Sequence, residues 1–158
     1  MLSIDALKKI DQAIAKYPPN RQQSAVMAAL TIAQDEKGWL SNEIIDFVAH
    51  YLNMPPIAVY EVATFYSMYN LQPAGRYKIT LCTNLPCALS GANVAAEHLK
   101  KKLGVDFNQT TADSLFTLKE GECMGACGDA PVLLVNNKRM CGFMTPDKLD
   151  ALLAELNP

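Results

Sequence analysis

The sequence predicts an α+β chain, with a bundle of helices first and a smaller unit of strands and helices after it. Apolar residues recur at helical spacing as far as Met68, whereas apolar and polar residues alternate, as in a strand, only from Tyr77 onward. Between the two patterns lie residues 72–75, Gln-Pro-Ala-Gly, which favour a turn. We therefore expect a boundary there, with a helical region at residues 1–73 and a second region at residues 74–158.

Four helices are predicted in residues 1–73. Each starts at a residue that caps a helix or fits its first turn, and these residues are Ser3, Asn20, Ser41 and the pair Pro55 and Pro56. The prolines at 18 and 19 end the first helix, and Gly38 is suited to the end of the second. Apolar stripes mark a buried side on the first three helices, at Ile10, Leu30 and Ile45 with their neighbours at helical spacing. The fourth helix carries Ile57, Tyr60, Thr64, Phe65 and Met68.

The fourth predicted helix holds four aromatic side chains within residues 59–69, VYEVATFYSMY. Two interpretations of this segment stay open. The aromatic residues pack the helical core, or some of them face outward, where Tyr and Phe are favoured at interfaces with other proteins.

The second region predicts four short strands and two helices. The strands are expected at residues 77–82, 115–119, 131–135 and 139–141, with Asn136 and Asn137 as a tight turn between the last two. One helix is expected from about Ser90 to Leu103, and another after Thr145. This order fits a four-stranded sheet with two helices against it, a shortened thioredoxin-like arrangement.

Four of the five cysteines form two close pairs in this region: Cys82 and Cys87 as C-x4-C, then Cys123 and Cys127 as C-x3-C, with 35 residues between the pairs. We expect Cys82 at the end of the first strand, Cys87 near the start of the next helix, and the second pair on a loop that reaches the same end of the sheet. Four thiolates are the ligands of a 2Fe–2S cluster. We interpret these four cysteines as its ligands, and Cys141 as a buried apolar side chain.

A structural four-cysteine zinc site is the main alternative. Zinc sites of this kind commonly use C-x2-C pairs with about 15–20 residues between them, which fits this spacing poorly. Structural disulfides are not expected in a reducing compartment, and the C-x-x-C of dithiol enzymes is absent. There is no Ser/His/Asp set, nucleotide-binding glycine motif or P-loop, so no catalytic residue is expected on this chain.

The charges around the cysteines predict a low reduction potential. Glu120, Glu122 and Asp129 lie beside the second pair, and no Lys or Arg lies inside either cysteine loop. Nearby negative charge disfavours an added electron. For orientation, plant-type ferredoxins lie near roughly −400 mV. Backbone N–H groups can offset part of the cluster's charge, and the glycines that allow this approach are Gly121, Gly125 and Gly128.

Bulk properties exclude several classes of partner. The formal net charge is −2 and no basic stripe is present, so nucleic acid and anionic membrane surfaces are not expected partners. No apolar run approaches the roughly 18 residues of a spanning helix, and the first residues do not form a secretory signal. We expect a cytoplasmic chain.

Three motifs together resemble one family. CTNLPC, ECMGACGDAP and VYEVATFYSMY are similar to the E-type subunit of NADH:quinone oxidoreductase, respiratory complex I, over nearly the whole chain. The resemblance implies a thioredoxin-like 2Fe–2S ferredoxin domain, with one iron held by Cys82 and Cys87 and the other by Cys123 and Cys127. Thioredoxin-like folds also favour a cis Pro131, which the residues alone leave open.

The same resemblance implies a set of partners. The cluster would exchange single electrons with FMN of an adjacent NADH-binding flavoprotein subunit, and FMN and NAD would stay on that subunit. The helical region at residues 1–73 would pack against it, on the cytoplasmic side of the inner membrane. Equivalent subunits of NAD-linked hydrogenases and formate dehydrogenases resemble this chain too, and the choice between these complexes stays open.

Overall fold

The computed structural model describes residues 1–157. The chain divides into two compact units, Met1–Pro73 and a second that begins at Ala74, and each is described by itself. Each unit has its own hydrophobic core.

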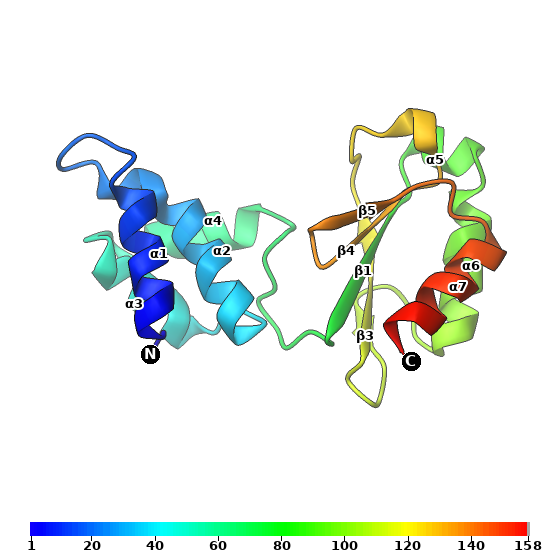
Figure 1. Ribbon diagram of the computed structural model, residues 1–158, viewed down its shortest axis with the longest axis horizontal. Helices are drawn as coiled ribbons and strands as arrows, with labels where there is room; N and C mark the ends of the chain where they lie inside the picture. Colours follow the sequence, from blue (N-terminus) through cyan, green and yellow to red (C-terminus); the bar gives the residue numbers. More distant parts are fainter. Residues whose placement is uncertain (158) are drawn as a thin grey trace. The chain divides into compact units, whose positions relative to one another are not determined.

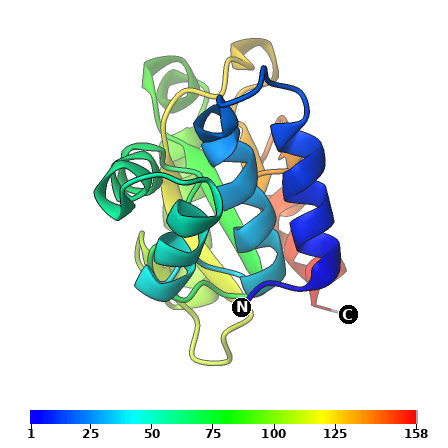
Figure 2. The ribbon, with the colours of Figure 1, turned by 90° about the vertical axis from the view of Figure 1, so that its left-hand side faces the viewer.

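The first unit is built entirely from helices. They are α1 (Ile4–Ile14), the 3-10 turn η1 (Gln22–Ala25), α2 (Val26–Lys37), α3 (Asn42–Tyr51) and α4 (Pro56–Phe65). Figure 2 shows α1 and α2 side by side at the front of this unit. The core draws on every helix, with Ile10, Leu30, Ile45 and Val59 each no more than 1% exposed. Burial of one apolar stripe per helix is therefore what holds the unit together.

Local sequence signals account for most of the helix ends. The hydroxyls of Ser3 and Ser41 accept hydrogen bonds from backbone N–H groups in the first turns of α1 and α3, as predicted. Gly38 ends α2 with a left-handed φ of 82°, which confirms its predicted role. Asn20 is a correction: it adopts a positive φ of 63° instead of capping a helix, and α2 begins only at Val26, after η1.

The second unit mixes strands and helices. In order they are β1 (Tyr77–Cys82), α5 (Leu85–Leu89), α6 (Ala92–Leu103), β2 (Gln109–Thr110), β3 (Phe116–Gly121), η2 (Cys127–Asp129), β4 (Leu133–Val135), β5 (Arg139–Cys141) and α7 (Pro146–Leu156). The strands form one sheet in the order β2-β3-β1-β4-β5. Only β1 and β3 pair in parallel.

Helices α6 and α7 lie on the same face of this sheet (Figure 1). Alternate residues of the strands, such as Ile79 and Leu118, face those helices and are fully buried against Leu99 and Leu149. The result is a two-layer α+β unit, which confirms the predicted fold class.

Three details of the second unit differ from the expectation. The sheet has a fifth strand, because Gln109 and Thr110 pair with β3 over two residues. A short separate helix, α5, precedes the long helix, which begins at Ala92 and not at Ser90 because Gly91 takes a positive φ of 99°. These differences leave the layer arrangement as predicted.

The turn and helix start near the C-terminus are as predicted. Asn136 and Asn137 both have positive φ, 52° and 57°, as a tight hairpin turn requires. Pro146 opens α7, although Thr145 makes no side-chain capping bond. The Ala130–Pro131 peptide bond is cis. Across residues 1–157, no helix is both long and apolar enough to cross a membrane.

In the first unit, the Glu36 carboxylate caps α1 by accepting hydrogen bonds from Ser3 N (3.1 Å) and Ser3 Oγ (2.7 Å). Its pKa is lowered from 4.5 to about 2, chiefly by the hydrogen bond from Lys37 and then by those from Ser3. A depressed folded-state pKa gives stabilisation that is present above pH 4.5 and is lost as the pH falls toward 2. Glu36→Gln should therefore lower Tm near pH 6, with a difference from wild type that shrinks below pH 4.5.

Calorimetry over this pH range measures the effect. Ser3→Ala is measured in both backgrounds as a comparison: it removes the cap on Ala6 N–H in each, and it should cost more in wild type, where it also removes the hydrogen bond from Ser3 Oγ to the Glu36 carboxylate. A Tm difference of constant size at every pH would contradict the assignment.

Candidate metal centre

The parallel pairing of β1 with β3 places the two cysteine loops at one edge of the sheet. Cys82, the last residue of β1, is in register with Gly121, the last residue of β3. Both strands therefore leave the sheet at the same end, where α5 and η2 are seen in Figure 1. The predicted meeting of the two loops follows from this register.

The first loop carries two buried thiols. Cys82 ends β1 as predicted, and its N–H donates to the carbonyl of Val132 at 3.0 Å. Cys87 lies inside α5, a correction to its expected place at the start of the long helix. Each cysteine is 2% exposed, and both pack with Ala92 and Val132.

The second loop carries two exposed thiols, Cys123 and Cys127. Gly125 lies between them with a φ of 71°, and its N–H donates to the Cys123 sulfur at 3.4 Å. A residue with a side chain is strained at such a φ, so glycine suits the turn that brings this N–H to the sulfur. The second loop thus already supplies one backbone donor to a candidate ligand.

Two of the other predicted ligands affect the Cys87 thiol. Burial raises the pKa of the Cys87 thiol, and a hydrogen bond with Cys82 and the charges of Cys82 and Cys127 add to the rise. Within residues 1–157, no group of three or more His, Cys, Asp or Glu side chains stands ready to hold a metal ion. The structure therefore gathers the two loops, and the complete ligand set stays a prediction.

The chemistry of this edge nevertheless fits a sulfur-ligated cluster. Cysteine thiolates are the ligands that iron–sulfur clusters require, and a backbone N–H already points at one sulfur. The first loop shields its two thiols from water, while the second leaves its two accessible for ligation. Burial of part of the centre and N–H···S hydrogen bonds are two of the factors that set the reduction potential of such sites.

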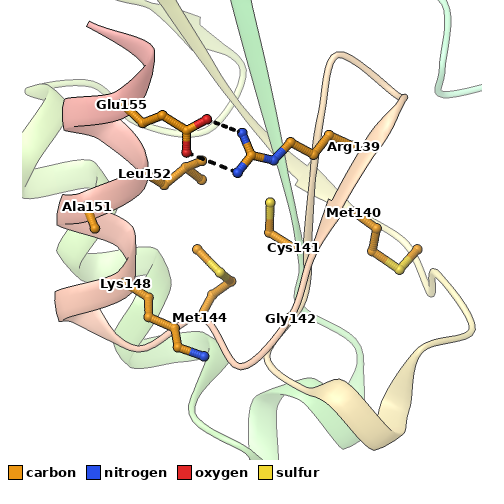
Figure 3. Close-up of a pocket in the computed structure, with 9 residues that line it drawn as sticks. All are labelled: Arg139, Met140, Cys141, Gly142, Met144, Lys148, Ala151, Leu152 and Glu155. Atoms are coloured by element: carbon orange, nitrogen blue, oxygen red, sulfur yellow. Dashed lines mark hydrogen bonds and ion pairs between the residues drawn. The ribbon is translucent and has the colours of Figure 1, made fainter. Parts of the chain in front are cut away.

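Cys141 lies elsewhere in the second unit. Its side chain on β5 points into a groove of about 370 Å³ between β5 and α7, beside Met144 and Leu152 (Figure 3). Arg139 and Glu155 span this groove with two hydrogen bonds of 2.5 and 3.0 Å. Cys141 is half-buried, and not fully buried as expected, and it packs on the apolar core of the second unit.

The segment after β5 fastens the second cysteine loop. Phe143 N donates to the Asp129 carbonyl at 2.6 Å, and Met144 N donates to the Pro131 carbonyl at 3.0 Å. A Cβ on Gly142 would lie 2.8 Å from the Asp129 Cβ and 3.0 Å from its carbonyl oxygen. This close approach was not predictable from the sequence, because residues distant along the chain create it.

Comparison with known proteins places this fold and site in a family. The sequence of residues 10–157 matches the thioredoxin-like [2Fe-2S] ferredoxin family. The E-type subunit of NADH-quinone oxidoreductase from Rickettsia typhi is 48% identical over 125 residues, which cover 78% of this chain and 74% of the relative. NADH-quinone oxidoreductase subunit 2 of Thermus thermophilus is 37% identical over 147 residues, covering 93% and 81%.

A solved structure shares the fold. The NAD+-reducing [NiFe]-hydrogenase in its air-oxidised state matches 81% of this chain with a TM-score of 0.69 at 22% identity. This chain spans only 22% of that hydrogenase chain, so the likeness concerns the fold.

The chain therefore belongs to the thioredoxin-like [2Fe-2S] ferredoxin family and, within it, to the family of E-type subunits of NADH-quinone oxidoreductase. This confirms the resemblance seen in its sequence motifs. These relatives are subunits of an oxidoreductase complex.

The close contact between Gly142 and Asp129, which holds the segment after β5 against the second cysteine loop, can be tested by substitution. Gly142→Ala should lower the free energy of unfolding by about 1–3 kcal/mol, because the added methyl group would overlap the Cβ and the carbonyl oxygen of Asp129. Gly128→Ala is the matched control, since a Cβ there meets nothing within 4 Å, and its effect should stay within about 0.5 kcal/mol. Denaturant unfolding of the apoprotein measures both, and equal effects would contradict the proposed fastening.

Proposed function

We propose that this chain is the electron-transferring E-type subunit of an NADH:quinone oxidoreductase and that one [2Fe–2S] cluster is bound by Cys82, Cys87, Cys123 and Cys127. When bound, the cluster accepts and returns single electrons, in exchange with FMN on an adjacent NADH-binding flavoprotein subunit. One observation carries the proposal: in a chain of the [2Fe-2S] ferredoxin family, two cysteine loops meet at one edge of the sheet.

The relatives favour this complex over a hydrogenase or a formate dehydrogenase. Proteins that are 37–48% identical over most of their length are named as NADH-quinone oxidoreductase subunits. The hydrogenase shares the fold at 22% identity. As part of such a complex, the chain would work on the cytoplasmic side of the inner membrane, bound through its partners.

Within the site, the protein's own groups would bind the cluster and adjust its reduction potential. The N–H of Gly125 stabilises negative charge on the Cys123 sulfur. Glu120, Glu122 and Asp129 add negative charge beside the second loop and disfavour a further electron. We therefore propose a low reduction potential for the cluster.

The helical unit offers an apolar surface for the flavoprotein. Four side chains of the segment that begins with α4 are exposed: Ile57 is 64% exposed, Phe65 80%, Tyr60 42% and Tyr66 39%. Tyr69, the remaining aromatic residue of the segment, is buried at 3%, so both interpretations of this segment hold in part. Exposed aromatic residues are enriched at protein interfaces. We propose that this α4 surface docks on the flavoprotein subunit, which keeps FMN and NAD for itself.

The ligand set is tested with two cysteine variants. Chains purified without air should contain about two irons each. Cys87→Ser should lose most of this iron, because it removes a buried ligand. Cys141→Ser should retain the iron, since this thiol lies in the β5–α7 groove. Loss of iron in both variants, or in neither, would contradict the ligand assignment.

Electron exchange is tested by mixing the pre-reduced chain with the FMN-loaded flavoprotein subunit. The flavin absorbance should bleach, and Tyr60→Ser should raise the partner concentration needed for half-maximal rate about tenfold, because it removes a docking side chain.

Tyr17→Ser is the matched control, since Tyr17 is also 42% exposed but lies outside the α4 surface. Its rate should match that of wild type. Equal losses in both variants would rule out the docking surface. Failure to bleach the flavin at all would rule out the proposed electron exchange.

A further inference from the structure

Two side-chain hydrogen bonds join the first cysteine loop to the end of β3 and to the residue that follows this strand. The Thr83 N–H donates to the Gly121 carbonyl at 3.3 Å, one step past the last paired residues of β1 and β3. From there the Thr83 hydroxyl donates to the Glu120 carboxylate at 2.8 Å. The Asn84 amide donates to the Glu122 carboxylate at 3.1 Å. The contact between the two segments thus continues through side chains toward the cysteines.

The four residues flank the candidate ligands. Thr83 and Asn84 follow Cys82 directly, and Glu122 immediately precedes Cys123. Each bond joins the first loop to the chain that leads into the second loop, across 37 or 38 residues of sequence, so both bonds restrain the separation of the loops. A hydrogen bond to a carboxylate is stronger than one between neutral groups.

Helix capping does not account for the Asn84 side chain. Asn84 is the residue before α5, but its side chain makes no capping bond there. Glu120 and Glu122 accept from neutral donors, so their negative charge is retained beside the site. Carboxylates next to an anionic centre are electrostatically unfavourable, which points to a positioning role that requires a strong acceptor.

We propose that Thr83, Asn84, Glu120 and Glu122 form an interloop clamp that holds the two cysteine loops at the spacing a cluster needs. The clamp consists of positioning residues, because none of them is a ligand. It rests on the proposed function, since it acts on the retention and geometry of the [2Fe–2S] cluster. The charge of its carboxylates also contributes to the low potential.

The main test is the rate at which the loaded chain loses its visible absorbance to an iron chelator. Thr83→Val combined with Asn84→Ala removes both donors and should accelerate the loss about tenfold. Ser90→Ala is the matched control, because the Ser90 hydroxyl donates to Pro86 within the first loop region and not across to the second. Equal rates in the double variant and the control would overturn the clamp.

A conservative variant separates hydrogen bonding from charge. Glu120→Gln combined with Glu122→Gln keeps a neutral carbonyl oxygen to accept each bond, so its rate of loss should lie between those of wild type and the Thr83→Val/Asn84→Ala variant. Its midpoint potential should rise, because two negative charges are gone. The paramagnetic signal of the reduced cluster should change shape in the Thr83→Val/Asn84→Ala variant and not in Ser90→Ala. If the Glu120→Gln/Glu122→Gln variant lost its visible absorbance as fast as Thr83→Val/Asn84→Ala, the proposed hydrogen-bonding role would be overturned.

Hydrogen exchange of the apoprotein tests the clamp independently of any cluster. Backbone amides of residues 122–127 should exchange faster in Thr83→Val/Asn84→Ala than in wild type, and unchanged exchange would overturn the clamp. A wild-type chain that takes up no cluster would overturn the proposed function, while this measurement would still decide whether the clamp exists.

Discussion

The site depends on the way the central strand β1 is paired on its two sides. Its parallel neighbour β3 ends beside Cys82, so the chain leaves the sheet there toward the second cysteine pair. Its antiparallel neighbour β4 begins at the same edge, where Cys82 donates to Val132. Both ends of the second cysteine loop are thus anchored next to the first loop. The strand register alone therefore brings the loops together, before any side chain of the loops makes a contact.

Local signals made the helical unit predictable, and the limits of these signals explain where the structure differs from the prediction. Serine caps and a left-handed glycine act within one turn of the chain, so Ser3, Ser41 and Gly38 could be assigned from the sequence. Asn20 has two uses, as a cap or as a residue of positive φ, and the sequence does not choose between them. The exposure of Tyr60 but not Tyr69 depends on which helices pack together, which is a property of the whole unit.

The site was predictable as far as the order of the elements determines it. A strand that ends at Cys82 and a second cysteine pair after another strand imply one shared edge. Three features depend on contacts between distant residues, for which the sequence carries no local signal. They are the short strand β2, the close approach at Gly142, and the hydrogen-bond partners of Glu120 and Glu122 in the clamp. Cys141 was left out of the predicted ligand set by its position alone, and its side chain lies in the β5–α7 groove.

One measurement tests the central claim that the four paired cysteines share a single [2Fe–2S] cluster. The intact chain is produced with ample iron and sulfide, purified without air, and examined by metal analysis and by absorption and paramagnetic resonance spectroscopy. The account predicts a red-brown protein with about two irons and two sulfides per chain and a resonance signal only after one-electron reduction. A colourless protein that carries zinc on the same cysteines would contradict it.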